Sequence, residues 1–325
     1  MRTLDLGTHV PASVIGLGTW QFGSREWGYG DDFADRQAGE IVRRALDLGV
    51  TFFDSAELYG FGRSERILGE ALGDRRDEVV VATKIFPLLP LAPVVEQRAV
   101  ASADRLGVRR IDLYQVHQAN PVVRDGTTMR GMGALQRTGL VDQVGVSNYS
   151  LDRWQAAERA LGGAVVSNQV EYSLVHRAPE EDLLPWARAE GRVVVAYSPL
   201  GQGVLSGRYT SGHRPQDAVR RANPVFAPEN LERLAPLLDT LRQVGEAHDL
   251  SASQAALAWV VARPNVLAIP GASSVEQLEK NVEAASVHLA DDEVAALDER
   301  SATFRRVSTL ERARGAVRRR VRRTA

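Results

Sequence analysis

The stretch from Val50 to Lys84 decides the fold class. It contains VTFFD at Val50–Asp54, a helical pattern over Ser64–Leu72 that ends at Gly73, and VVVATK at Val79–Lys84. The two apolar runs have the length of strands and are nearly continuous, which is typical of parallel strands covered on both faces. A helix between two such strands makes a strand–helix–strand unit, so the stretch predicts an α/β protein with a parallel sheet.

The same alternation extends over the rest of the chain. Further helical patterns cover Ile41–Leu48 before Gly49 and Pro179–Ala189 before Gly191, and Ser251-x-x-Gln254 and Ser274-x-x-Gln277 are expected capping boxes. Eight strands are expected, at Val14–Thr19, Val50–Asp54, Val79–Lys84, Asp112–His117, Gln143–Ser147, Val166–Val170, Val193–Tyr197 and Val266–Pro270. Eight strands with helical crossovers predict a (β/α)8 TIM barrel, with active-site loops at its C-terminal face. An open doubly wound sheet would give a similar pattern.

Length and composition indicate one globular enzyme-sized unit. The 325 residues fit a single barrel domain, 1–325, and the irregular segment 201–230 is expected to be a functional loop. The chain has no cysteine, which excludes disulfides, thiolate catalysis and cysteine-bound metals. It also has no apolar run of membrane-spanning length and no signal-peptide pattern, so we expect a cytoplasmic protein without a membrane partner.

The C-terminal end is strongly basic. From Phe304 onward there are nine arginines and one acidic residue, Glu311, although the whole chain carries a formal charge of only −1. A tail of this composition, about 304–325, is typically solvated and flexible. No aromatic residues are interleaved with the arginines, so binding of nucleic acid by base stacking is not expected.

Ionisable residues occur at consecutive strand ends. Asp54 and Tyr59 follow the second expected strand, Lys84 ends the third and His117 ends the fourth. Lys84 is one of only two lysines in a chain rich in arginine, which suggests a need for a compact ammonium. Each residue alone has an ordinary structural explanation, but the carboxyl ends of barrel strands form one face, so the four are expected to meet there.

Such a group supports proton donation to a carbonyl oxygen. An ammonium beside a tyrosine is expected to lower the pKa of the phenol, and a carboxylate would hold the ammonium in place. A neutral imidazole can orient the carbonyl, and the hydride must come from a cofactor. The chain contains no GxGxxG fingerprint, GxxxxGK loop, HExxH or GxSxG motif, and its six histidines are scattered, so no metal site is expected.

The sequence resembles the aldo-keto reductase superfamily over roughly residues 10–300, and is closest to its bacterial and channel-β-subunit-like branches. The segments that carry the resemblance are GLGTWQFG (Gly16–Gly23), GVTFFDSAELYG (Gly49–Gly60), VVVATK (Val79–Lys84), RIDLYQVHQ (Arg110–Gln118), VGVSNYS (Val144–Ser150), SNQVEYSL (Ser167–Leu174), AYSPLGQGVLSGRY (Ala196–Tyr209) and IPGASSVEQLEKN (Ile269–Asn281). The resemblance implies a catalytic tetrad of Asp54, Tyr59, Lys84 and His117, with Tyr59 as general acid. It also implies NAD(P)H-dependent reduction of a small-molecule carbonyl.

The resemblance further implies a nicotinamide cofactor extended across the top of the barrel. Its carboxamide would be held by Ser147, Asn148 and Gln169, and its ring would stack on Tyr197. The remaining implied cofactor contacts are Thr19, Trp20, Ser198, Pro199, Leu200, Gly201, Arg208, Gly271, Ser273, Gln277, Lys280 and Asn281. The helix opened by Ser273–Gln277 would favour an anion at its N-terminus.

The cofactor is expected to be NADPH, with NADH as the alternative. Many members of the family have a lysine or arginine after the eighth strand, where this chain has Gly271, Ala272 and Ser273. In those members the basic residue pairs with the 2′-phosphate of NADPH. Lys280, Arg208, Arg220 or Arg221 could supply this positive charge instead. Candidate walls of the substrate pocket are Trp20, Trp27, Phe86, Tyr149 and Phe226, whereas Trp154, Trp186 and Trp259 are expected to pack in the core.

Two other functions stay open at this point. A cofactor-bound regulatory subunit that senses redox state would use the same fold with little turnover. A lysine beside Asp and Tyr at a strand end could also form a Schiff base, as in an aldolase-like lyase. The sequence does not predict the carbonyl substrate, the physiological direction or the oligomeric state.

Overall fold

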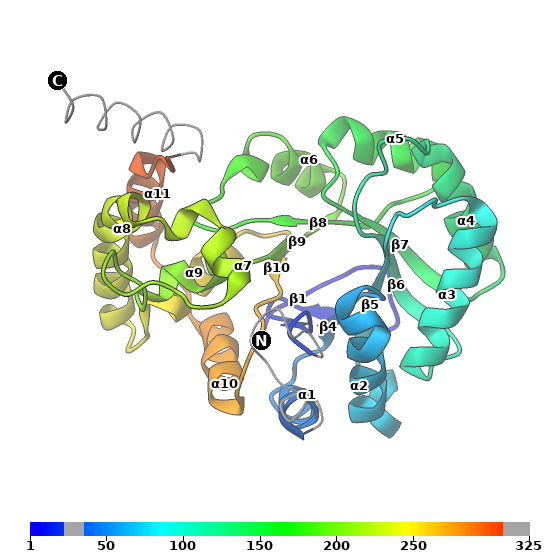
Figure 1. Ribbon diagram of the computed structural model, residues 1–325, viewed down its shortest axis with the longest axis horizontal. Helices are drawn as coiled ribbons and strands as arrows, with labels where there is room; N and C mark the ends of the chain where they lie inside the picture. Colours follow the sequence, from blue (N-terminus) through cyan, green and yellow to red (C-terminus); the bar gives the residue numbers. More distant parts are fainter. Residues whose placement is uncertain (23–35, 308–325) are drawn as a thin grey trace, which may run out of the picture.

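Eight parallel strands form one strongly curled sheet at the centre of the protein (Figure 1). The structure is a computed structural model and describes residues 1–22 and 36–307. Strand order in the sheet follows the chain from β3 to β10, and every neighbouring pair is parallel. The strands are β3 (Leu17–Gly18), β4 (Phe52–Asp54), β5 (Val80–Ile85), β6 (Ile111–Val116), β7 (Val141–Ser147), β8 (Ser167–Glu171), β9 (Val193–Tyr197) and β10 (Val266–Ala268).

All eight expected strands are therefore confirmed, but the sheet does not close into a complete barrel. Between the edge strands the pairing consists of one bridge, Ile15 to Ala268, and a few backbone hydrogen bonds, including Gly16 N to Ala268 O at 2.8 Å. The ladder is short because β3 has two residues and β10 has three. The result is a curled half-barrel with a weakly paired seam between its first and last strands.

Helices cover the outer face of the sheet (Figure 1). The helices α8, α9 and α11 pack together on one side, on the left of Figure 1. In chain order the helices are α1 (Ala38–Asp47), α2 (Arg63–Leu72), α3 (Ala92–Leu106), α4 (Asp125–Arg137), α5 (Leu151–Leu161), α6 (Leu183–Ala189), α7 (Ala218–Ala222), α8 (Pro228–Ala247), α9 (Ala252–Val261), α10 (Val275–Glu283) and α11 (Asp291–Thr303). Short 3₁₀ turns include η3 (Tyr59–Gly62) and η6 (Gly201–Ser206).

The two expected capping boxes differ in the structure. At α9 both halves are present, because Ser251 accepts the Gln254 N–H and Gln254 accepts the Ser251 N–H. At α10 Ser274 accepts the Gln277 N–H, but the Gln277 side chain accepts from the N–H and hydroxyl of Ser273 instead. The second box is thus only half formed, and Gln277 turns toward the preceding loop.

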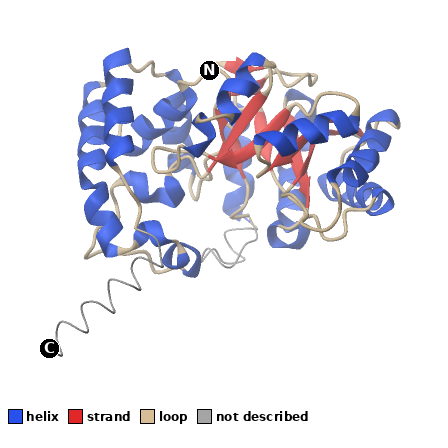
Figure 2. Cartoon of the chain, turned by 90° about the horizontal axis from the view of Figure 1, so that it is seen from above, coloured by secondary structure: helices blue, strands red, loops and turns tan. Residues whose placement is uncertain are grey.

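Two apolar layers hold the sheet. Its concave interior is filled by side chains such as Phe52, Val80, Leu113 and Leu267. Its outer face packs against the helices in a larger cluster that includes Trp154 and Trp259, with Trp186 packed on it, as expected for these tryptophans. The red strands in Figure 2 lie between blue helices, which shows this layering.

A hairpin not anticipated from the sequence precedes the sheet. Its strands β1 (Thr3–Leu4) and β2 (Ala12–Ser13) are antiparallel. Leu6 and Ala12 enter the interior cluster, and Gly7 O accepts a hydrogen bond from the side chain of Gln143, near the start of β7. The hairpin therefore covers the amino end of the sheet and leaves the carboxyl end for the functional loops.

The first residues of the basic C-terminal tail lie along α8. Val307 N donates to the side chain of Asn230 at 2.8 Å, and Arg233 donates to Arg305 O at 3.2 Å. The rest of the predicted tail, 308–325, lies outside the described residues. Within the described part of the chain, the helices are all too short or too polar to span a membrane.

Candidate active site

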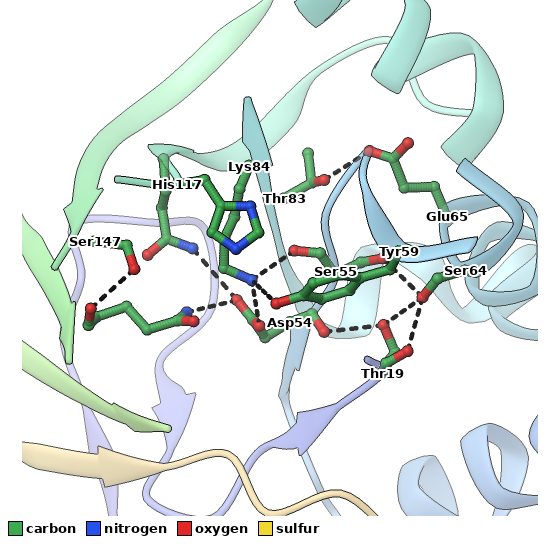
Figure 3. Close-up of polar contacts among 12 residues, drawn as sticks. Thr19, Asp54, Ser55, Tyr59, Ser64, Glu65, Thr83, Lys84, His117 and Ser147 are labelled. Atoms are coloured by element: carbon green, nitrogen blue, oxygen red, sulfur yellow. Dashed lines mark hydrogen bonds and ion pairs between the residues drawn. The ribbon is translucent and has the colours of Figure 1, made fainter. Parts of the chain in front are cut away.

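A cavity of about 500 Å³ opens at the carboxyl ends of the strands. Asp54 ends β4 and Ser147 ends β7, while Tyr59 and His117 follow β4 and β6 within a few residues. Asp54, Tyr59 and His117 all line the cavity, and Lys84 lies fully buried behind them on β5. The four residues expected to meet from separate strand ends are brought together (Figure 3).

Lys84 is the centre of this group. Its Nζ donates to Asp54 Oδ2 at 2.6 Å, to Ser55 O at 2.8 Å and to Tyr59 OH at 3.0 Å, as Figure 3 shows. Although burial favours its neutral form, Asp54 and Tyr59 together hold the pKa of Lys84 above its ordinary value. The ammonium is therefore charged, fully hydrogen-bonded and fixed against the phenol.

The second carboxylate oxygen of Asp54 is also held by hydrogen bonds. Asp54 Oδ1 accepts from Gln169 Nε2 at 2.7 Å and faces Gln115 Nε2 at 3.3 Å. With one oxygen on the ammonium and the other on amide donors, both oxygens of the carboxylate are held by hydrogen bonds. Gln115 is a contact that the sequence analysis missed; its place on β6, two residues before His117, was the available signal.

The pKa of Tyr59 is raised from its ordinary value, which differs from the sequence expectation. Burial raises it most, and the nearby Lys84 ammonium opposes that effect without overcoming it. The expectation considered the charge next to the phenol but not the loss of water around it. The consequence is a phenol that keeps its proton, which is the form a proton donor must have.

The pKa of His117 lies well below its ordinary value, which favours the uncharged imidazole at neutral pH. Burial lowers its pKa to about 3, with a smaller contribution from the Lys84 ammonium. Its ring lies edge-on to Tyr59, with centroids 5.7 Å apart, and edge-on to Phe86 at 6.3 Å. Its Nδ1 is buried and has no hydrogen-bond partner among the described residues. The site therefore contains the uncharged imidazole that the sequence analysis expected.

A network of hydroxyl groups holds the backbone below Tyr59. Thr19 Oγ1 bonds to Asp54 O at 3.0 Å and lies 2.7 Å from Ser64 Oγ, which in turn lies 3.0 Å from Ser55 Oγ. Thr19 is fully buried and does not line the cavity. Its side chain ties β3 to β4 and α2, so it faces away from the space where a cofactor would lie.

Ten of the expected cofactor contacts line the cavity and six do not. Those on the wall are Trp20, Ser147, Asn148, Gln169, Tyr197, Ser198, Pro199, Leu200, Gly271 and Gln277. Those away from it are Thr19, Gly201, Arg208, Ser273, Lys280 and Asn281. Lys280 instead pairs with Glu276 at 2.7 Å, and Asn281 donates to Gly271 O at 3.3 Å, supporting the loop before α10.

Several wall residues were not singled out from the sequence. They are Gly18, Gln21, Leu58, Gln118, Gln202, Gly203, Ile269 and Pro270. Gln21, Gln118 and Pro270 lie two or three residues after the ends of β3, β6 and β10, close to strand ends as the tetrad residues are. Arg220, one of four residues considered as a source of positive charge, is on the wall as well. The expected functional loop 201–230 thus reaches the cavity through η6 and α7.

Backbone strain is concentrated at the same face. Asn148, Ser198 and Gln202 line the cavity and have left-handed conformations, with φ of 59°, 49° and 58°. Non-glycine residues adopt this conformation at a cost in free energy, and such positions cluster at functional sites. Tyr197 OH donates to Asn148 Oδ1 at 2.9 Å, which fixes that side chain in place.

The expected aromatic walls are only partly confirmed. Trp20 lines the cavity and stacks on Tyr59, with centroids 6.2 Å apart, and Phe86 reaches His117 without lining the cavity. Tyr149 is buried with its hydroxyl on Asp125, and Phe226 is buried against Tyr209, so these two are packing residues. Trp27 lies outside the described residues.

Several known proteins are similar to this chain over most of its length. Residues 14–302 match the model of the Aldo/keto reductase family. An uncharacterized oxidoreductase of Mycobacterium tuberculosis is 56% identical over 309 residues, or 95% of each chain. The NADH-specific methylglyoxal reductase of Escherichia coli is 32% identical over 94% of this chain and 100% of its own length.

Solved structures of aldo/keto reductases are also similar to this chain. An aldo/keto reductase from Klebsiella pneumoniae, in complex with NADP and acetate, superposes with a TM-score of 0.74 at 28% identity, covering 91% of this chain and 94% of its own. The family match spans most of the sequence, including the tetrad and every strand of the sheet. The protein is a member of the aldo/keto reductase family of oxidoreductases.

Proposed function

We propose that the protein reduces an aldehyde or ketone to an alcohol with a hydride from NAD(P)H, and that Tyr59 is the general acid. The proposal depends above all on the hydrogen-bonded series Tyr59–Lys84–Asp54 at the wall of the cavity. The whole chain, 1–325, would act as a single barrel domain. The family to which it belongs supports carbonyl reduction as the reaction class.

Each member of the tetrad has a separate role in this proposal. The reduced nicotinamide, when bound, supplies the hydride to the carbonyl carbon. Tyr59 gives its proton to the carbonyl oxygen as negative charge develops there, and Lys84 stabilises the phenolate that remains. Asp54 keeps Lys84 charged and in place. His117, as a neutral imidazole, donates a hydrogen bond that orients the carbonyl oxygen.

The described residues fit a nicotinamide cofactor. The wall offers amide groups at Asn148 and Gln169, a hydroxyl at Ser147 and the ring of Tyr197, which suit a carboxamide and an aromatic ring. Ser198, Pro199 and Leu200 would line the pyrophosphate path, and Gly271 and Gln277 the adenosine end. The other expected residues would support the wall without touching the cofactor: Thr19, Gly201, Ser273, Lys280 and Asn281. Arg208 would lie outside the cofactor path.

We propose NADPH as the preferred cofactor. Arg220 is proposed as the cation that meets its 2′-phosphate, the group that NADH lacks. Of the described residues that line the cavity, Arg220 is the one with a permanent positive charge. It pairs with Asp217 at 2.9 Å, and Lys280 pairs with Glu276. These acidic partners compete with a phosphate, so NADH is the alternative, and the E. coli relative is named as NADH-specific.

The change that tests the proposal is Tyr59→Phe, which removes only the phenolic oxygen. The variant should still bind NADPH but oxidise it at least about 10²-fold more slowly with an aldehyde, because the proton donor is lost. Turnover is measured by NADPH absorbance, and binding by quenching of tryptophan fluorescence. Tyr209→Phe is the matched control, because Tyr209 packs on Phe226 away from the cavity wall.

Three outcomes separate the candidate functions. Carbonyl-dependent oxidation that is lost in Tyr59→Phe and kept in Tyr209→Phe supports the reductase. Tight NADPH binding without turnover of any carbonyl favours a cofactor-bound regulator. Trapping of Lys84 by borohydride with a carbonyl compound would indicate a Schiff-base lyase and contradict the proposal.

A further inference from the structure

Most of the large exposed apolar side chains among the described residues lie in loops at the carboxyl end of the sheet. Nine such side chains are exposed, and six of them lie in the loops after β3, β4, β5 and β6. Leu91 is the N-cap residue of α3, and Met1 and Val100 lie elsewhere. We call the six the apolar rim: Trp20, Leu58, Phe61, Leu88, Leu89 and Val122.

A ring contact and several hydrogen bonds connect the four loops to one another. Trp20 stacks on Tyr59, which connects the loops after β3 and β4. Glu57 accepts the Phe86 N–H, and Arg98 bonds to both residues, which connects the loops after β4 and β5. Asn120 donates to Pro87 O at 2.6 Å, which connects the loops after β5 and β6. The four loops that carry the apolar rim are therefore joined in sequence from β3 to β6.

Two residues of the rim have an unfavourable backbone conformation and are also exposed to solvent. Phe61 is 90% exposed and Leu89 is 63% exposed, and both have left-handed backbones, with φ of 54° and 50°. Bulky residues rarely adopt this conformation, and glycine would adopt it without strain. Exposure of a large apolar side chain also brings no folding benefit. Both residues are therefore expected to lower the free energy of unfolding. Because they do not stabilise the fold, their position points to a role in binding.

The rim continues into the cavity on the side away from the cofactor path. Trp20 and Leu58 belong to the rim and also line the cavity, and Trp20 stacks on Tyr59. The lining residues that follow β7, β9 and β10, which include Asn148, Gln202, Arg220 and Gln277, carry many polar groups and form the proposed cofactor side. A carbonyl held at Tyr59 OH would thus have its remaining substituents directed between a polar cofactor and an apolar surface.

We propose that the substrate is an aldehyde or ketone with an extended apolar chain or ring, which lies on the apolar rim while its carbonyl meets Tyr59. This inference rests on the proposed reductase function and narrows its substrate class. It separates this protein from reductases of small polar carbonyls, because a compound such as methylglyoxal has no apolar chain that could lie on the rim. The binding free energy would come from apolar surface of the substrate and of the rim that is removed from water.

The test is a series of straight-chain aldehydes from propanal to octanal, with methylglyoxal as a small polar reference and saturating NADPH. Each methylene that lies on the rim should raise kcat/KM roughly two- to threefold, so octanal should exceed propanal by at least about thirtyfold. In the double variant Phe61→Gly, Leu89→Gly this ratio should fall at least about tenfold. The matched control Val100→Ala removes exposed apolar surface on α3 and should keep the wild-type ratio.

A binding measurement keeps the test independent of turnover. Octanamide should bind the NADP-loaded wild type at least about tenfold more tightly than propanamide in calorimetric titration, and the double variant should lose most of this difference. The thermal midpoint of the double variant should equal or exceed that of the wild type, because glycine relieves both left-handed positions.

Several results would overturn the inference. Equal kcat/KM for propanal and octanal, or an unchanged ratio in the double variant, would show that substrates do not use the rim. If no aldehyde is reduced, the proposed function fails, and the amide titration alone then decides whether the rim binds apolar chains. A dimer that dissociates in the double variant, with no chain-length effect, would identify the rim as an interface between copies.

Discussion

At the scale of single residues, burial decides the protonation of His117 and makes stability depend on pH. In the folded protein its pKa is lowered to about 3, whereas an unfolded chain has a histidine pKa of about 6.5. Between these values the unfolded chain binds more protons than the folded one. The free energy of unfolding is therefore expected to fall as the pH drops from about 6.5 toward 3, and this contribution is fully present above 6.5.

Urea unfolding of the wild type and His117→Gln at several pH values between 7 and 4 measures this effect. The variant should lose stability less steeply, because glutamine does not titrate. His288→Gln is the matched control, since the His288 side chain is exposed, and it should follow the wild type. An identical slope in all three proteins would mean that His117 gains its proton equally in the folded and unfolded states.

At the scale of elements, the sequence predicted the strands and which polar residues meet at their ends, but not the direction of each side chain. The β-branched runs identified all eight strands, and the polar residues at their ends identified four side chains that the structure brings together, because a strand end fixes the position of its last residue within a few ångströms. Thr19 was assigned to the cofactor, yet its hydroxyl bonds to Asp54 O and Ser64. A one-residue difference at a strand end turns a side chain from the cavity to the core, and no local pattern reveals it.

Long-range contacts also decided which basic residue reaches the cavity. Arg208, Arg220 and Arg221 looked equivalent in the sequence of the loop. In the structure Asp217 caps α7 and pairs with Arg220, whose Nε donates to Gln202 O at 2.9 Å. This contact between α7 and η6 places Arg220 on the wall, whereas Arg221 is exposed beside it.

Arg220→Gln should weaken NADPH binding at least about tenfold, since a charge-assisted hydrogen bond contributes roughly 1.5–3 kcal/mol. Arg221→Gln removes the same charge from the same helix and should bind NADPH like the wild type. Arg220→Lys, which keeps the charge, should recover part of the affinity. Fluorescence titration with NADPH and NADH measures all four proteins. An equal loss for both cofactors would place Arg220 at the pyrophosphate and contradict its role in selecting NADPH.

At the scale of the whole molecule, the curled sheet depends on close backbone contact across the seam between β3 and β10. A Cβ on Gly18 would lie 2.8 Å from Ile269 O, and one on Gly16 would lie 2.7 Å from Phe52 O. These distances are shorter than van der Waals contact with backbone atoms that cannot rotate away. Gly18 therefore permits the first strand to approach the last one, whereas Gly16 permits the same segment to approach β4. The approach at Gly18 also shapes the cavity, because Gly18, Ile269 and Pro270 line it.

Gly18→Ala should push the two edges apart and reduce both stability and cofactor binding. Overpacking of this kind costs about 1–3 kcal/mol, which lowers the urea midpoint, and displacement of Ile269 should weaken NADPH binding in the same variant. Gly163→Ala is the control, because a Cβ there meets nothing within 4 Å, and its midpoint should stay level or rise slightly. If Gly18→Ala loses stability but binds NADPH normally, the seam supports the fold alone. If it loses neither, the edges have room to separate and the seam does not hold the sheet in its curled form.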